Sequence, residues 1–186
     1  MSHAIDFDGF VDKLFVLRHL VHGAPSYCVS EDIGTEIDAG DESFDEYWGR
    51  LKGLSSNYLI ECAVKARMIQ EYCSKDDYDD ELTKFEQDAV GKLSLGTVRE
   101  GDFKLTLREA SNKIIHSTSA IIEFKNTNTE GSSYKYWDGK YHLHGTHRNK
   151  QWHVELCVES WAKAMSAFLE ILADNEKTFY MGQDWS

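Results

Sequence analysis

Apolar residues spaced three and four positions apart predict two long amphipathic helices in the first part of the chain. They recur at this spacing over residues 8–22 and again over residues 44–73, and this is the period of one face of an α-helix. Gly23 and Pro25 are expected to end the first helix. At ~1.5 Å per residue, the second run predicts about 45 Å of helix.

Three shorter helices are predicted further along the chain. Thr83 and Thr106 are each followed three residues later by a glutamate, the spacing of a capping box, which satisfies backbone N–H groups at a helix start. The two boxes predict helices over about 83–93 and 107–117. A last apolar stripe predicts a helix over about 160–175.

Between the last two helices the pattern changes to the two-residue alternation of β-strands. Strands are predicted at 120–124 and 151–158, with a hairpin between them whose two-residue turn is Asp138-Gly139. That turn would place Trp137 opposite Lys140 and fix which side chains share a face. The face toward the helices is predicted to carry Tyr134, Tyr136, Tyr141 and Leu143, with Trp152, Val154 and Leu156. The opposite face is predicted to carry Lys135, Trp137, Lys140, His142 and His144, with His153 and Glu155 alongside.

These elements predict one mainly α domain over residues 1–186. With 186 residues, 41% of them hydrophobic, the chain is long enough to bury one sizeable core. The expected architecture is a helical bundle of about four main helices, with a small antiparallel β-meander inserted at about residues 119–158.

Charge and cysteine usage narrow the function classes. The net charge is −12, which disfavours general nucleic-acid binding unless basic residues are gathered locally. They are gathered between Tyr134 and His153, a window that holds four lysines and arginines and only one acidic residue, Asp138. Four of the eight histidines also lie in this window. The four cysteines form no CxxC pair, which argues against a disulfide framework or a cysteine zinc site. We expect a cytoplasmic protein with no signal peptide and no membrane contact.

The helix predicted at 107–117 carries a candidate catalytic set. Arg108, Asn112 and His116 are four residues apart and therefore lie along one side of the helix. An imidazole transfers protons and a guanidinium stabilises phosphate charge, which are the requirements for cleaving RNA through its own 2′-hydroxyl. The alternative is that Arg108 is solvated and His116 interacts with the helix C-terminus.

The same segment, Leu107 to His116, resembles the HEPN superfamily, as does the preceding stretch from Ile60 to Arg67. The resemblance implies a helical bundle, often from bacterial defence or toxin systems, that dimerises and acts as a metal-independent endoribonuclease without a cofactor. It implies catalytic roles for Arg108 and His116, with Asn112 as a polar neighbour. Family members carry Arg-x4–6-His, whereas seven residues separate the pair in this chain. An Arg108 of one chain would then serve the His116 of a partner chain, or neither residue would be catalytic.

The predicted hairpin offers two further hypotheses. Lysines and arginines beside an exposed aromatic ring are typical of single-stranded RNA binding. The predicted RNA-binding set is Lys135, Trp137, Lys140, His142, His144, Arg148 and Lys150. His142 and His144, with His147 or His153, would also suit zinc, but a solvated polar face is the simpler reading and no metal is expected.

The leading function from sequence is a HEPN-like protein of bacterial defence or toxin type, acting on RNA as a homodimer. The alternative is a catalytically inactive interaction or scaffold module that binds a protein partner.

Overall fold

The computed structural model describes residues 5–35, 42–74, 79–129 and 131–175. Within these residues, five helices combine with the four strands of a single sheet. The elements are α1 (Phe7–Ser30), α2 (Glu42–Ser74), α3 (Asp79–Val90), β1 (Gly96–Glu100), α4 (Leu107–His116), β2 (Ser119–Thr129), β3 (Ser132–His147), β4 (Lys150–Cys157) and α5 (Val158–Asp174).

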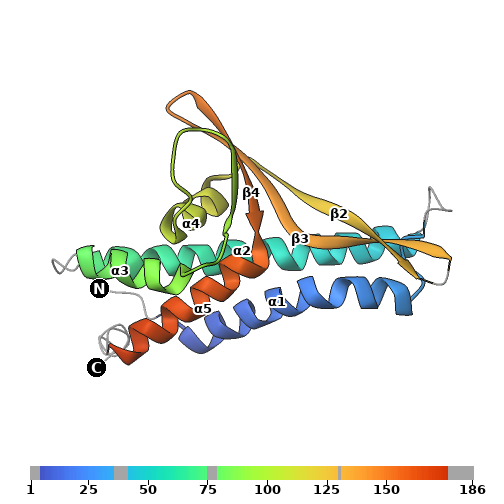
Figure 1. Ribbon diagram of the computed structural model, residues 1–186, viewed down its shortest axis with the longest axis horizontal. Helices are drawn as coiled ribbons and strands as arrows, with labels where there is room; N and C mark the ends of the chain where they lie inside the picture. Colours follow the sequence, from blue (N-terminus) through green and yellow to red (C-terminus); the bar gives the residue numbers. More distant parts are fainter. Residues whose placement is uncertain (1–4, 36–41, 75–78, 130, 176–186) are drawn as a thin grey trace.

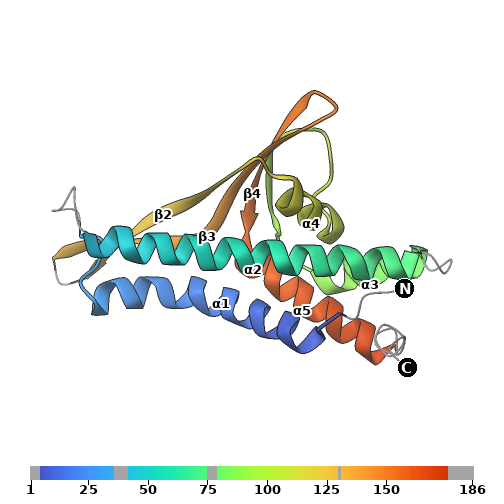
Figure 2. The ribbon, with the colours of Figure 1, turned by 180° about the vertical axis from the view of Figure 1, so that it is seen from behind.

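The helices form a layer on one side of the sheet. α1 and α2 lie side by side and run in opposite directions, and the sheet leans over them (Figure 1). α5 packs against α1 and α3, and α4 packs on α2 beneath one end of the sheet. The reverse view shows α1 and α2 along the side of the molecule away from the strands (Figure 2). No described helix has both the length and the apolar character needed to cross a membrane.

The predicted fold class is wrong, because the structure is α+β rather than a mainly α bundle. Its described residues form five helices and a four-stranded antiparallel sheet with the strand order β1-β4-β3-β2. β1 precedes α4 in the chain and pairs with β4, so the sheet is not an insertion before the last helix. The sequence prediction missed β1 because its five residues, GTVRE, show no continuous apolar alternation.

The first helix does not end at Gly23 and Pro25. α1 continues through both residues to Ser30. Pro25 removes one backbone N–H from the helix, but Ala24 and Cys28 are buried against the core on either side of it. Tertiary packing therefore outweighs the local signal that would stop the helix.

The predicted Asp138-Gly139 turn is also wrong. β3 runs without a break from Ser132 to His147, and Asp138 and Gly139 lie where its register with β2 shifts. Gly139 has φ +82°, so its freedom from a side chain serves a β-bulge rather than a hairpin turn. The tight turn lies instead between β3 and β4, at Arg148 (φ 49°) and Asn149 (φ 63°).

Losing that turn reverses the predicted position of Trp137. Along an uninterrupted strand, side chains alternate between faces, so Trp137 shares a face with Tyr141 and Leu143. All three are buried, and Trp137 and Tyr141 have no exposed surface. The predicted position of Trp137 on the open face is wrong, and its indole N–H donates to the carbonyl of Lys140 (2.9 Å).

A polar contact ties the sheet to α2. The Tyr141 hydroxyl lies 2.7 Å from Ser55 Oγ and 3.0 Å from Ser56 Oγ. These contacts satisfy a phenol that is otherwise surrounded by core side chains, and burial raises the pKa of Tyr141. The hydroxyl group thereby fixes the position of β3 along α2.

Gly139 provides a test of the bulge. We expect Gly139→Ala to lower the free energy of unfolding by about 2–5 kcal/mol, through strain at positive φ and crowding of a packed core. A Cβ at this position would lie 2.5 Å from Cγ1 of Val21, whereas one at Gly131, whose φ is +85°, would meet nothing within 4 Å. Gly131→Ala is therefore the matched control and should cost about 1–2 kcal/mol. Urea denaturation measures both, and equal losses would contradict the packing of Gly139 against Val21.

Candidate functional site

The structure does not bring the predicted catalytic set of α4 together. Arg108 lies in the first turn of α4 and His116 is its last residue, about 12 Å apart along the axis. Arg108 is half-buried while His116 is exposed. Asn112 donates through Nδ2 to Glu109 (3.2 Å) within the same helix. Arg108 and His116 of one chain therefore do not form a joint site.

Arg108 belongs instead to a polar network between α2, α3 and α4. Glu86 is buried, accepts a hydrogen bond from Gln70 Nε2 at 2.7 Å and another from the backbone N–H of Arg108. Burial raises the pKa of Glu86, and the positive charge of Arg108 opposes that shift. Arg67 extends the network by donating to Gln70 Oε1 (3.0 Å). The backbone N–H of Arg108 thus joins α4 to the contact between α2 and α3, and the charge of its guanidinium acts on the carboxyl group of Glu86.

The predicted RNA-binding residues divide into three groups. Trp137 is buried and offers no ring surface for a base. Arg148 and Lys150 are exposed at the turn after β3. Lys135 is also exposed, but its predicted position on the open face is wrong, because it shares a face with Trp137 and its ammonium lies 5.8 Å from the ring centroid of Phe124. The remaining residues, Lys140, His142 and His144, lie on the open face of the sheet as predicted, where each is half-buried among other polar groups.

Charged and imidazole side chains gather on that open face from all four strands. Strand pairing places His142 opposite Glu155 and His144 opposite His153. Arg99 from β1 and Lys140 from β3 both contact Glu155, and Glu123 from β2 contacts His142. We call this group the sheet-face cluster; it consists of Arg99, Glu123, Lys140, His142, His144, His153 and Glu155.

Two members of the cluster come from irregular strand positions and were missed as site residues from sequence. The register of β1 against β4 shifts between Val98 and Glu100, with Arg99 between them. The register of β2 against β3 shifts between Ile122 and Phe124, with Glu123 between them. Bulges redirect side chains in this way next to functional sites. The alternation of the strand predicted at 120–124 was a usable signal for Glu123, but Arg99 lay in a strand that was not recognised.

Glu155 binds both cations of the cluster. Its Oε1 lies 2.8 Å from Lys140 Nζ and its Oε2 accepts from Arg99 Nε at 3.0 Å. Hydrogen bonds from Lys140 and then from Arg99 lower the pKa of Glu155 to about 2. The same pairing raises the pKa of Lys140. At neutral pH these groups are charged, and the two cations offset the charges of Glu155 and Glu123.

His142 connects a carboxylate to a second imidazole. Its Nε2 lies 3.1 Å from Oε2 of Glu123, and its Nδ1 lies 3.0 Å from Nε2 of His153. An ionised carboxylate only accepts hydrogen bonds, so Nε2 of His142 carries the hydrogen. Nδ1 of a neutral His142 then accepts from the Nε2–H of His153, which leaves the lone pair of His153 on its Nδ1. The tautomers follow from the partners of each ring.

His153 is held toward its neutral form. Burial lowers its pKa first, and the nearby His144, His142 and Arg99 lower it further. The ring of His144 stacks on that of His153, with centroids 4.0 Å apart and planes at 19°. The imidazoles of His144 and His153 thus lie side by side, and that of His153 is also hydrogen-bonded to His142.

Metal-binding atoms also meet in this cluster. One ligand atom from each of Glu123, His142 and Glu155 lies within 4.8 Å of the others. The ammonium of Lys140 already occupies this side of the cluster, at 2.8 Å from Glu155 and 3.7 Å from Glu123. A divalent ion there would have to displace Lys140 from its strongest partner, so we do not assign a metal to this triad.

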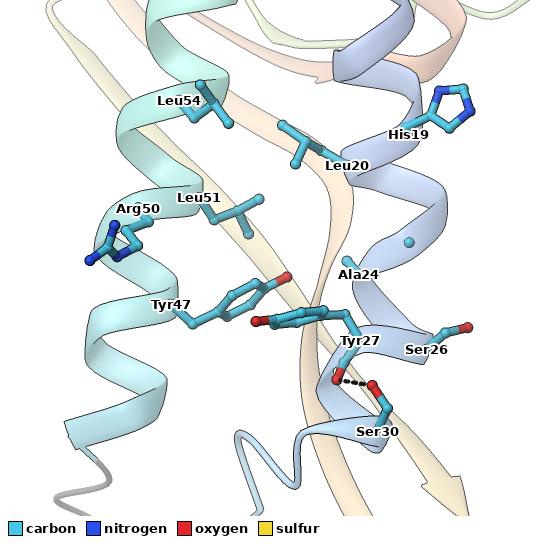
Figure 3. Close-up of a pocket in the computed structure, with 11 residues that line it drawn as sticks. His19, Leu20, Ala24, Ser26, Tyr27, Ser30, Tyr47, Arg50, Leu51 and Leu54 are labelled. Carbon is cyan, nitrogen blue, oxygen red and sulfur yellow. Dashed lines mark hydrogen bonds between the residues drawn. The ribbon is translucent and has the colours of Figure 1, made fainter.

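A separate apolar groove lies between α1 and α2. It has a volume of about 580 Å³, and its walls include Leu20 and Ala24 of α1 and Leu51 and Leu54 of α2. Figure 3 shows the rings of Tyr27 and Tyr47 meeting across the groove; their centroids are 5.3 Å apart. The groove offers contact area but few groups capable of chemistry.

Comparison of the chain with protein-family models, with curated proteins and with solved structures finds no match in any of the three. The resemblance to HEPN proteins therefore stays a prediction from the sequence.

The ion pairs of Glu155 predict a pH-dependent contribution to stability. Glu155→Gln is expected to lower the free energy of unfolding at pH 7 by about 1–3 kcal/mol, because Lys140 and Arg99 lose a charged partner. The folded-state pKa of about 2 lies below the ~4.3 of an unfolded glutamate. The contribution is therefore present above the unfolded value and is lost as the pH falls toward the folded value.

Urea denaturation at several pH values measures this difference. The stability gap between wild type and Glu155→Gln should shrink between about pH 5 and pH 2. Glu100→Gln, which changes an exposed glutamate on the same sheet, is the control and should show a small gap throughout. A Glu155→Gln gap that does not change with pH would contradict the assignment of these ion pairs.

Proposed function

We propose that this protein is a metal-independent endoribonuclease whose reacting groups are those of the sheet-face cluster. The observation that carries the proposal is the chain of hydrogen bonds from Glu123 through His142 to His153. Arg99 lies beside it with a side chain that is 53% exposed. Proton-transfer groups and a cation accessible to a phosphate are what cleavage of RNA through its 2′-hydroxyl requires.

The proposed reaction uses the two stacked histidines in opposite roles. His153 accepts the proton of the 2′-hydroxyl on its Nδ1 as the oxygen attacks the adjacent phosphorus. His142 and Glu123 hold the ring of His153 in the required tautomer and stabilise the positive charge that develops on it. His144, in its protonated form, donates a proton to the departing 5′-oxygen, so a cyclic phosphate and a 5′-hydroxyl are formed.

Cations complete the proposed site. Arg99 keeps donors beyond those directed at Glu155, and a guanidinium stabilises the charge on a phosphoryl group as it is attacked. Arg148 and Lys150 are exposed at the turn after β3 and are suited to phosphates further along a single strand of RNA. Trp137 has no part in the proposal because it is buried.

The HEPN resemblance implies that the same RNA cleavage takes place at a different site, on α4. In that arrangement Arg108 of one chain and His116 of another would meet in a dimer, and the process would be bacterial defence or a toxin system. The link between Arg108 and buried Glu86 disfavours this site. We therefore place the proposed chemistry on the sheet and use His116 as the comparison.

RNA cleavage by the purified protein in EDTA tests the proposal. His153→Ala is expected to lower the cleavage rate about 10²- to 10⁴-fold, the usual contribution of a general acid or base. Glu123→Gln should lower it less, because the imidazoles remain. His147→Ala removes an exposed histidine at the end of β3, the strand next to that of His153, and is the matched control; it should cleave at the wild-type rate.

Each other outcome identifies a different function. Cleavage lost in His116→Ala but retained in His153→Ala would place the site on α4, as the HEPN resemblance implies. Absence of cleavage by folded wild-type protein on single-stranded and structured RNA would reject the enzyme. Equal cleavage by all variants would indicate a contaminating nuclease.

The second candidate function is a catalytically inactive interaction module, and the groove between α1 and α2 favours it. Its apolar walls are of the kind that protein interfaces bury. The occupant we propose is a second copy of this chain, because a homodimer through the helices is also what the HEPN resemblance implies.

Oligomeric state tests the dimer directly. Leu54→Glu places a charge in the groove and is expected to shift the protein toward monomer, with at least a tenfold weaker association measured by sedimentation velocity. Val64→Glu is the control, since Val64 has a similar exposed fraction, 40% against 38% for Leu54, on the same helix but does not line the groove. A monomeric wild type, or equal effects of the two changes, would reject this interface.

A further inference from the structure

The two imidazoles at the centre of the sheet-face cluster are close to the spacing of two ligands on one metal ion. Nδ1 of His142 and Nε2 of His153 are 3.0 Å apart. Zinc–nitrogen bonds of 2.0–2.1 Å in tetrahedral geometry place two nitrogens about 3.3 Å apart. A shift of a few tenths of an ångström, with a rotation of the two rings so that both lone pairs point at one ion, would therefore convert the hydrogen-bonded pair into a ligand pair.

The opposite nitrogen of His142 already has the partner that a metal-binding histidine usually has. Ligating histidines commonly donate their second ring N–H to a carboxylate, which fixes the tautomer and the orientation of the ring. Nε2 of His142 lies 3.1 Å from Oε2 of Glu123, which makes Nδ1 the nitrogen that faces His153. His142 comes from β3 and His153 from the adjacent β4, so both rings are held by the sheet.

We propose that Nδ1 of His142 and Nε2 of His153 bind a divalent transition-metal ion of the zinc type. When the ion binds, the proton on Nε2 of His153 moves through solvent to its Nδ1, so both histidines ligate as neutral imidazoles and no net proton is released. His144 is the nearest further imidazole, since its ring stacks on His153 at 4.0 Å. Solvent oxygens supply the remaining ligands. Nitrogen ligands favour zinc, copper or nickel over magnesium or calcium.

This position is distinct from the triad of Glu123, His142 and Glu155. The triad uses the Nε2 side of His142, where the ammonium of Lys140 lies 2.8 Å from Glu155. The proposed ion lies on the Nδ1 side, away from that contact, and Glu123 supports the site without ligating the metal. The two positions predict different effects of mutation.

Occupation of this position would inhibit RNA cleavage, and this consequence rests on the proposed function. A metal on Nε2 of His153 removes its hydrogen bond to His142 and adds positive charge beside the reacting groups. His153 could then no longer accept the 2′-hydroxyl proton. The binding of metal itself does not depend on the ribonuclease proposal.

Zinc binding by the full chain, without a polyhistidine tag, tests the site. The affinity is measured by competition with a chromophoric chelator, and Co²⁺ absorption reports nitrogen ligation. Wild type should bind one zinc ion per chain with this site as the tightest. His153→Ala should weaken binding at least about 10-fold, and Glu123→Gln about 10- to 100-fold, as for other outer partners of ligating histidines.

Two variants serve as controls for this measurement. His147→Ala removes an exposed histidine of β3 and should leave the affinity unchanged. Glu155→Gln should not weaken binding at the proposed position, but it would abolish binding at the triad. Near-ultraviolet circular dichroism confirms that each variant is folded.

Unchanged affinity in folded His153→Ala would overturn the proposal, as would loss of binding in Glu155→Gln alone. The RNA assay separates this result from the proposed function. Zinc bound by a wild type that never cleaves RNA supports the metal site and rejects the enzyme. RNA cleavage by a wild type that binds no zinc supports the enzyme and overturns the metal site.

Discussion

The alternation of side chains along β3 is the constraint on which the rest of the structure depends. This strand continues through Asp138 and Gly139, so Trp137, Tyr141 and Leu143 all face the helices. The side chains between them, Lys140 and His142 among them, necessarily face outward. One strand thus supplies both the apolar layer that seals the core and the polar surface that carries the candidate chemistry. Neither could be changed in register without disrupting the other.

Electrostatic balance allows three histidines to crowd on the outward face. Arg99 and Lys140 neutralise Glu155 directly, and this pairing lowers the pKa of Glu155 to about 2. Glu123 is left to orient His142. Burial, and after it the charges of His144, His142 and Arg99, lower the pKa of His153 and so hold this imidazole toward its neutral form beside its neighbours. The pairing with cations occupies the carboxylates that a metal ion would otherwise use.

The helical layer has a separate polar network, and it changes the meaning of the residues that first suggested an activity. Glu86, Gln70 and Arg67 join α2 to α3, and Arg108 connects α4 to them. Removing the partners of a buried carboxyl group lowers the free energy of unfolding strongly, because the group is left buried without compensation. An arginine and a histidine at helical spacing are therefore a weak guide to catalysis, since Arg108 interacts with a buried carboxylate of α3 while His116 is exposed at the other end of α4.

The sequence by itself determined where the five described helices lie along the chain, because the 3.6-residue period is a local property. It also determined the start of α4, where the Thr106 hydroxyl accepts from the N–H of Glu109 (3.1 Å) as predicted. Other helix ends were wrong, since α1 continues to Ser30 and α3 begins at Asp79, before the predicted cap at Thr83. The sequence also placed Lys140, His142 and His144 on one face of the sheet. They are two residues apart, so they share a face whether the chain turns at Asp138-Gly139 or continues as one strand. Only the tertiary structure decided the fold class, the position of Trp137 and the entry of Arg99 and Glu123 into the cluster. Those depend on strand pairing between distant segments and on bulges, and a turn signal such as Asp-Gly is overridden when a longer strand buries more apolar surface.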